Sequence, residues 1–173
     1  MGKERKAQEV ERESKAGSSS ANPALSTICS HSTSRKCRKG KVVEQRIFNP
    51  WTWQNEFGYV QVQEVRSAQR TLFCAGQTSV DAEGRAVHPE DMRARITQPM
   101  DNLETVLRQA EAELSDVVCL NYYTTDVDRI FEAYDAVITR LSGAGCSPAS
   151  TLLGVARLAF PELLVEIEAT AVT

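Results

Sequence analysis

Lysine is absent from the chain beyond position 41. All six lysines lie in the first 41 residues, and residues 42–173 contain one histidine, His88, in the turn-like stretch VHPED. A domain without lysine cannot form a Schiff base through its own side chains or complete a Walker-type phosphate loop. One histidine at a loop edge also disfavours a Ser-His-Asp or Cys-His arrangement. The usual catalytic arrangements are therefore mostly excluded.

Long apolar runs and regularly spaced cysteines are also missing. No run of eighteen apolar residues occurs, which argues against a transmembrane helix, and the first twenty residues lack the apolar stretch of a secretory signal. The five cysteines are an odd number without regular spacing, as expected for free thiols in a reducing compartment. A metal site at Cys29, His31 and Cys37 is disfavoured because C-x-x-C pairs are absent. We therefore expect a cytoplasmic protein without a metal site.

The net charge of −3 conceals two regions of opposite charge. Residues 1–41 carry ten Lys and Arg against four Glu (10 − 4 = +6), whereas residues 42–173 carry ten Arg against nineteen acids (10 − 19 = −9). The first region is rich in serine and poor in aromatic residues, a composition that cannot bury enough surface to order itself. We expect a disordered, basic and serine-rich tail over 1–45 and one domain over 46–173. The basic run at 35–41 could contact nucleic acid, but a solvated tail is the simpler interpretation.

Hydrophobic periodicity predicts the elements of the domain. Alternation predicts a strand over 57–68, with a more apolar strand over 70–80 as its hairpin partner, and further strands are predicted over 116–125, 150–159 and 163–172. Apolar residues spaced by three and four predict one helix from about residue 89 to 114 and another over 126–141. The resulting order, β-β-α-β-α-β-β, predicts an α+β fold with both helices on one face of a mixed sheet.

The second predicted helix has a defined start and a defined buried face. Asp126 or Asp128 is the expected N-cap, because an aspartate oxygen can accept from the free N–H groups of the first turn. The residues predicted to face the core are Ile130, Tyr134, Val137 and Leu141.

Two glutamates share one face of the last predicted strand. In ELLVEIEATA, Glu166 and Glu168 alternate with apolar residues, so both carboxylates point to the same side. Like charges at this spacing raise each other's pKa, so a purely structural strand gains little from the pair. Strands 70–76 and 150–158 are apolar on both faces, which indicates that the sheet face without helices is buried too. Association with copies of the same chain is the simplest way to cover it.

Five stretches of the domain carry a resemblance to a known family. They are GYVQ (58–61), FCAGQTSVDAEG (73–84), DNLETVL (101–107), SDVVCLNYYTTDVDRIFEAY (115–134) and PASTLLGVARLAFPELLVEIEATAV (148–172). In this order and spacing they resemble the RidA/YjgF family of imine deaminases, also called the L-PSP endoribonuclease family. The resemblance implies a chorismate-mutase-like fold and a homotrimer, in which the sheets form a central barrel and three clefts lie between subunits.

The resemblance also implies a reaction without metal or cofactor. Family enzymes hydrolyse enamines and imines to an oxo compound and ammonia; a carboxylate and backbone groups hold the water, and an arginine binds the substrate carboxylate. Glu166 matches the water-holding carboxylate, and Tyr59 matches the tyrosine that lines the cleft. Gly76 matches the glycine whose backbone approaches the ligand. Leu152 matches the residue whose main chain contacts the water.

Three positions depart from the family's deaminases. Ser150, in PAS, replaces the carboxylate-binding arginine of PAR; Ala75 replaces a serine; and Asp135 stands where the deaminases have an asparagine. A serine hydroxyl carries no charge and cannot form the bidentate pair that arginine forms with a carboxylate. Arg157 is seven residues from Ser150 and faces away from it on a regular strand. We therefore expect a neutral or cationic ligand at these residues rather than an anionic 2-imino acid.

Three functions remain open from the sequence. The first is a hydrolase of imines or related reactive small molecules, and the second is a non-enzymatic trimer that binds a small ligand. The third is an RNA-directed activity, which the charge of −9 on residues 42–173 disfavours because like charge repels phosphate. For Glu168, a solvated or inter-subunit ion-pair face is the simpler interpretation.

Overall fold

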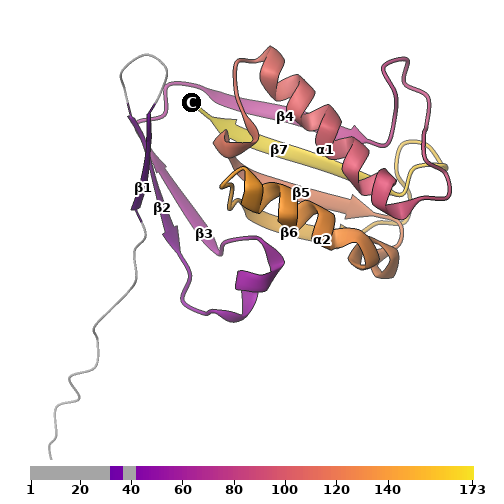
Figure 1. Cartoon of the computed structure of the whole chain (residues 1–173), viewed down its shortest axis with the longest axis horizontal. Coiled ribbons are helices and arrows are strands. Elements are labelled where there is room, and N and C mark those ends of the chain that lie inside the picture. The colour runs from indigo at the N-terminus through magenta and orange to yellow at the C-terminus, as the bar shows by residue number, and fades with distance from the viewer. Residues whose placement is uncertain (1–31, 37–41) are drawn as a thin grey trace, which may run out of the picture.

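The computed structural model describes the backbone of residues 32–36 and 42–173 and the side chains of residues 43–173. The strands are β1 (Ser32–Lys36), β2 (Val42–Phe48), β3 (Val62–Arg66), β4 (Thr71–Thr78), β5 (Val117–Thr124), β6 (Ala149–Gly154) and β7 (Val165–Val172). The helices are α1 (Met92–Gln109) and α2 (Val127–Gly143), with short 3-10 helices η1 (Trp53–Phe57) and η2 (Leu114–Asp116). From β3 onward this order is the predicted β-β-α-β-α-β-β (Figure 1).

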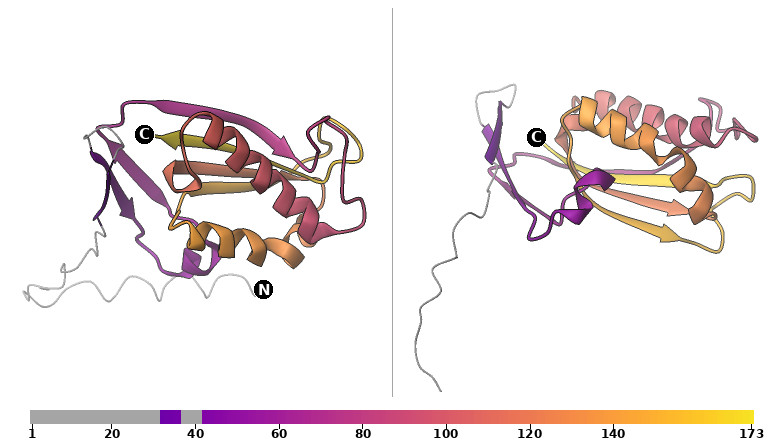
Figure 2. Two further views of the ribbon diagram at one scale, coloured as in Figure 1. Left: turned by 45° about the horizontal axis from the view of Figure 1, so that its top comes forward. Right: turned by 60° about the horizontal axis from the view of Figure 1, so that its bottom comes forward.

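The main sheet has four strands in the order β4-β7-β5-β6. Strands β5 and β6 run parallel, whereas β7 is antiparallel to both of its neighbours, so the sheet is mixed as predicted. Helices α1 and α2 lie side by side on one face of this sheet (Figure 2), and no helix among the described residues covers the other face. The predicted α+β layout, with two helices on one face, is confirmed.

The core lies between the two helices and the sheet. Its fully buried side chains include Ile96, Met100 and Leu103 of α1, with Ile130 of α2 and Ile167 of β7. Two aspartates fix where the helices begin. The Asp91 side chain accepts a hydrogen bond from Ala94 N (3.0 Å), so α1 starts later than predicted. The Asp126 side chain accepts one from Arg129 N (3.1 Å), which confirms the predicted N-cap of α2.

A buried arginine connects two loops at the start of α1. The guanidinium of Arg95 donates to the carbonyl oxygens of His88 (2.7 Å), Pro89 (2.7 Å) and Glu162 (3.0 Å). Arg95 is only 8% exposed, so these carbonyls replace the water that its charge would otherwise need. The segment before α1 is thereby tied to the loop before β7.

The predicted hairpin between residues 57–68 and 70–80 is wrong. Strand β3 pairs with β2 in a separate three-stranded sheet, β1-β2-β3, and not with β4. Ser67 has a left-handed backbone (φ 62°), which turns the chain out of β3. Thr173 at the end of β7 then accepts hydrogen bonds from the backbone N–H groups of Gln69 (2.7 Å) and Arg70 (2.9 Å). Hence the residues that would close the hairpin are bonded to β7 instead.

Two predicted boundaries also differ from the structure. Strands β1 and β2 occupy residues 32–36 and 42–48, which include part of the segment predicted as a disordered tail; residues 1–31 and 37–41 lie outside the described residues. Strand β6 ends at Gly154 rather than at residue 159. Arg157 is therefore an exposed loop residue, so its predicted place on a strand face is wrong.

Candidate functional site

Strand β7 presents two different faces. Val165, Ile167 and Ala169 are buried on the helix side, at 1%, 0% and 5% exposure. Glu166 and Glu168 alternate with them and lie half-buried on the opposite face. The predicted two-carboxylate face is thus confirmed, and it lies on the side of the sheet that the helices do not cover.

Glu166 lies against an irregular stretch of β4. The pairing between β4 and β7 shifts register between Cys74 and Gln77, which leaves Ala75 and Gly76 in a bulge close to Thr78, the residue that pairs with Glu166. A Cβ atom on Gly76 would overlap the Glu166 carboxylate, so only glycine leaves space for it. Glu166 accepts no hydrogen bond from any other residue that the structure describes. Its oxygens are therefore left for a solvent molecule or a ligand.

Glu168 differs because its carboxylate is already occupied. Its Oε1 atom accepts hydrogen bonds from Asn121 Nδ2 (3.0 Å) and from the Tyr123 hydroxyl (2.8 Å). These two bonds, that of Asn121 foremost, hold the pKa of Glu168 below its ordinary value, and the bond to Glu168 raises the pKa of Tyr123. Among the described residues its partners are thus an amide and a phenol rather than the cation of an ion pair. Neither partner was predicted from the sequence, although strand alternation in NYYTT places both on one face.

A second group of predicted site residues lies around the start of β6. The Val60 backbone N–H donates to Pro148 O (3.0 Å), and Val60 pairs with Ala149, which brings Tyr59 beside the start of this strand. The Ser150 hydroxyl donates to Leu120 O (2.6 Å), on the helix side of the sheet. Leu152 is partly buried against the core on the same side.

The two groups do not meet within one chain. Strand β5 separates β6 from β7, so Ser150 and Glu166 lie two strands apart, roughly 10 Å across the sheet. Ser150 is opposite Leu120 and therefore points to the helix face, whereas Glu166 points to the other face. The structure thus brings together Glu166, Ala75 and Gly76, and separately Tyr59, Ser150 and Leu152.

Asp135 belongs to neither group. It lies on the outer surface of α2, where both of its carboxylate oxygens accept from Arg93 Nη2 (2.8 Å each), and this arginine lowers the pKa of Asp135. The neighbouring Tyr134 points inward instead, as the helix periodicity predicted, with its ring 5.5 Å from that of Tyr122. Burial raises the pKa of Tyr134, and nearby Tyr59 adds to this effect. Tyr134 of α2 is thus within electrostatic range of Tyr59.

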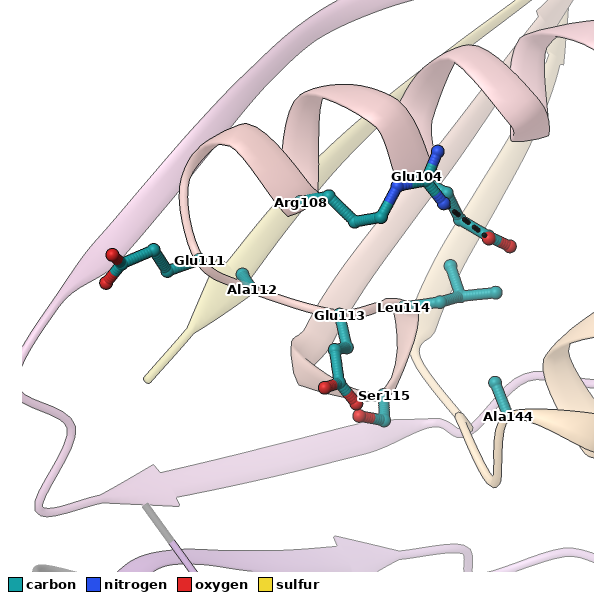
Figure 3. Close-up of a pocket in the computed structure, with 8 residues that line it drawn as sticks. All are labelled: Glu104, Arg108, Glu111, Ala112, Glu113, Leu114, Ser115 and Ala144. Atoms are coloured by element: carbon teal, nitrogen blue, oxygen red, sulfur yellow. Dashed lines mark ion pairs between the residues drawn. The ribbon is translucent and has the colours of Figure 1, made fainter. Parts of the chain in front are cut away.

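The structure also contains a cavity of about 510 Å³ where α1 leads into η2 (Figure 3). Its lining residues are Glu104, Arg108, Glu111, Ala112, Glu113, Leu114, Ser115 and Ala144. Glu104 and Arg108, one turn apart on α1, form an ion pair at its edge (3.5 Å). It contains none of the predicted site residues. Within the described part of the chain, no cluster of three His, Cys, Asp or Glu could hold a metal ion, and no helix is long and apolar enough to cross a membrane.

Comparisons with known proteins identify the family of the chain. The Endoribonuclease L-PSP family matches residues 54–173. A RutC family protein of Pyrococcus abyssi is 30% identical over 100 residues, which cover 58% of this chain and 76% of that protein. The crystal structure of YyfB of Yersinia pestis, described as a protein of the conserved Rid family, is 36% identical and covers 75% of this chain and 98% of its own, with a TM-score of 0.67.

A more distant structure shows the same fold. The crystal structure of E. coli TdcF with bound serine is 21% identical and covers 66% of this chain and 87% of its own, with a TM-score of 0.55. The match over residues 54–173 includes β3 to β7, both long helices and both groups of site residues. The chain therefore belongs to the Endoribonuclease L-PSP family, the family also known as RidA/YjgF.

Proposed function

We propose that the protein hydrolyses a small neutral or cationic imine in a cleft between two copies of the chain, with Glu166 as the residue that holds and deprotonates the water. The observation that carries the proposal is the contrast between the two carboxylates of β7. Glu168 is occupied by Asn121 and Tyr123, whereas Glu166 rests on Gly76 without a hydrogen-bond donor among the described residues. A carboxylate left open in this way can accept a proton from water.

A second copy is needed because one chain presents only half of the site. Glu166 and Gly76 lie on the sheet face without helices, and Tyr59, Ser150 and Leu152 lie at the β6 side. The uncovered face also exposes Phe73, at 83%, and Leu153, at 50%. Burial of such side chains favours association with another copy, and the homotrimer implied by the family resemblance provides it. A subunit junction would then bring Glu166 of one copy to Tyr59 of the next.

The reaction follows from ordinary imine chemistry. Water bound to Glu166 attacks the imine carbon while the carboxylate takes its proton, so that a carbon–oxygen bond forms and the C=N double bond becomes a single bond. The nitrogen takes the proton held by Glu166 and then the proton of the new hydroxyl group, so that the carbon–nitrogen bond breaks, ammonia leaves, and the carbon becomes an oxo group. Backbone groups at Gly76 and Leu152 are the proposed contacts that orient the water and the substrate.

The preference against anions rests on Ser150. Its hydroxyl donates to Leu120 O at 2.6 Å, so this position offers neither a positive charge nor a free donor to a substrate carboxylate. An arginine at the same position would supply a charged, bidentate contact. A 2-imino acid would therefore bring its carboxylate toward Glu166 without compensation.

The experiment compares two imines generated in place. A flavin amine oxidase acting on benzylamine releases a neutral imine, and an amino-acid oxidase acting on alanine releases the anionic 2-iminopropanoate. We expect the protein to accelerate decay of the neutral imine and to have little effect on the anionic one. Glu166→Gln should abolish the acceleration, and exposed Glu132→Gln should not. Ser150→Arg should give partial activity on the anion.

Three results would contradict the proposal. They are equal acceleration of both imines by the wild type, full activity of Glu166→Gln, or no acceleration of the neutral imine. The last result would leave the non-enzymatic binding protein as the better function. Binding of RNA by residues 42–173 alone would support the third function instead, against the repulsion expected from their charge of −9.

A further inference from the structure

Exposed aromatic rings gather beside Tyr59. The short helix η1 presents Trp53 and Phe57, which are 60% and 43% exposed. The ring of Trp53 lies edge-on to Phe57 and to Tyr59, with 6.5 Å between ring centroids in each pair. We call Trp53, Phe57 and Tyr59 the aromatic wall. These rings lie next to a residue that the proposed function places in the ligand site.

The wall is held in place by buried contacts. Gln54 is fully buried within η1, and its Nε2 donates to Trp51 O (2.7 Å) and to Asn55 Oδ1 (3.2 Å). Gly58 ends η1 with a left-handed backbone (φ 72°), and a Cβ there would come within 3.4 Å of the Ile138 side chain on α2. The hydrogen bonds of Gln54 and the contact of Gly58 with α2 hold η1, so the rings of the wall have a defined position.

A further exposed ring lies on α2, where it packs on the buried Tyr134. Phe131 is 52% exposed, and its ring lies 5.9 Å from that of Tyr134. Ser150, at the start of the neighbouring strand, contributes no charge. The β6 side of the proposed cleft therefore combines aromatic rings with the uncharged side chains of Ser150 and Leu152, and the charge that the other copy adds is the carboxylate of Glu166.

We infer that the aromatic wall is the specificity-determining part of the site, and that Trp53 selects a ligand that carries an organic cation, such as an ammonium or iminium group, next to a flat apolar group. This inference rests on the proposed function for the position of Glu166. Aromatic faces attract cations through their quadrupole, indole most strongly, and they offer nothing to a carboxylate. The negative charge of Glu166 on the opposite side also favours a positively charged ligand.

The test uses three probes that share one ring and differ in charge: benzyltrimethylammonium, benzyl alcohol and benzoate. Dissociation constants for the full chain are measured by isothermal titration calorimetry. We expect the cation to bind most tightly and benzoate least. Trp53→Ala should weaken the cation about tenfold, Trp53→Phe should keep part of the affinity, and both should leave benzoate unchanged.

Trp51 provides a matched control in the same segment. It is 58% exposed and makes no ring contact with the wall among the described residues, so Trp51→Ala should bind all three probes as the wild type does. Equal effects of Trp51→Ala and Trp53→Ala, or benzoate binding as tight as the cation, would overturn the inference. Dissociation of the oligomer in Trp53→Ala alone, measured by light scattering, would show instead that the wall is a subunit contact.

Failure of this inference and failure of the proposed function have different signatures. If the neutral imine is hydrolysed but the cation does not depend on Trp53, the aromatic wall is refuted and the hydrolase stands. If the cation binds through Trp53 and loses affinity in Glu166→Gln while no imine is hydrolysed, the wall is supported and the hydrolase is refuted.

Discussion

Substitution of Gly76 by alanine tests the contact on which the proposed site depends. The added Cβ would overlap the Glu166 carboxylate, whereas Cβ atoms in proteins essentially never approach another heavy atom within 3.0 Å. The backbone of Gly76 is not in the left-handed region, so alanine fits it without strain. The overlapping atoms belong to a flexible side chain, and the carboxylate must therefore move by roughly 1 Å or more, a displacement large enough to impair catalysis.

The expected cost in stability is small and the expected cost in activity is large. Turning the Glu166 side chain off its preferred rotamer costs about 0.5–1.5 kcal/mol. Replacing glycine by alanine lowers the conformational entropy of the unfolded chain, which stabilises the folded state by about 0.4–1 kcal/mol. The free energy of unfolding should thus change by less than about 1 kcal/mol, or roughly 2–4 °C in Tm. A misplacement of this size lowers hydrolysis about 100-fold.

A double-mutant cycle makes the reasoning independent of any one substrate. In a Glu166→Ala background the overlap no longer exists, so adding Gly76→Ala should stabilise the protein, and urea unfolding should show coupling between the two sites. Gly143→Ala is the matched control, because nothing lies within 4 Å of its Cβ position. Unchanged hydrolysis in Gly76→Ala, or additive effects on unfolding, would refute the arrangement of Glu166 on Gly76.

Three further predictions concern stability. Arg95→Met should lower the free energy of unfolding by about 3 kcal/mol in urea titrations, because three carbonyls that bond to the buried Arg95 guanidinium lose a charged donor, while the exposed Arg93→Met should cost under about 1 kcal/mol. Because folding lowers the pKa of Glu168 from its ordinary value of 4.5, the ionised carboxylate stabilises the folded state at pH values above 4.5. The difference in unfolding free energy between the wild type and Glu168→Gln should therefore shrink as the pH falls below 4.5, and a difference that is independent of pH would contradict this. Asp126→Ala should cost about 1 kcal/mol in thermal melts, and Asp128→Ala, which removes no cap, markedly less; equal losses would argue against the cap.

Strand alternation and helix periodicity correctly predicted side-chain directions, because these depend only on residues close by in the sequence. Alternation in VEIEATAV placed both glutamates on one face, and the structure confirms it because a strand has a fixed two-residue period. Periodicity in α2 turned Tyr134 toward the core, which implies that Asp135, one residue further round the helix, points elsewhere. The family resemblance assigned Asp135 to the site, whereas the structure pairs it with Arg93 on the outer surface of α2.

Pairing between distant segments could not be predicted in the same way. Strand β3 has the pattern of a hairpin partner for β4, but any strand offers the same backbone groups to any edge. The turn at Ser67 and the bonds from residues 69 and 70 to Thr173 direct the chain elsewhere. Likewise, the parallel register with β5 turns Ser150 toward the helices, where its hydroxyl donates a hydrogen bond to Leu120 O.

By itself, therefore, the sequence determined the helices, most of the strands, the carboxylate face of β7 and the family, because these depend on local periodicity and on motifs in order. The tertiary structure decided which half of the site each residue joins. Strand order and the bulge at Ala75 and Gly76 place Glu166 against backbone with its oxygens open, and they leave Ser150 two strands away on the other face. The physical reason is that the direction of a side chain in a sheet depends on register with strands that are remote in the chain.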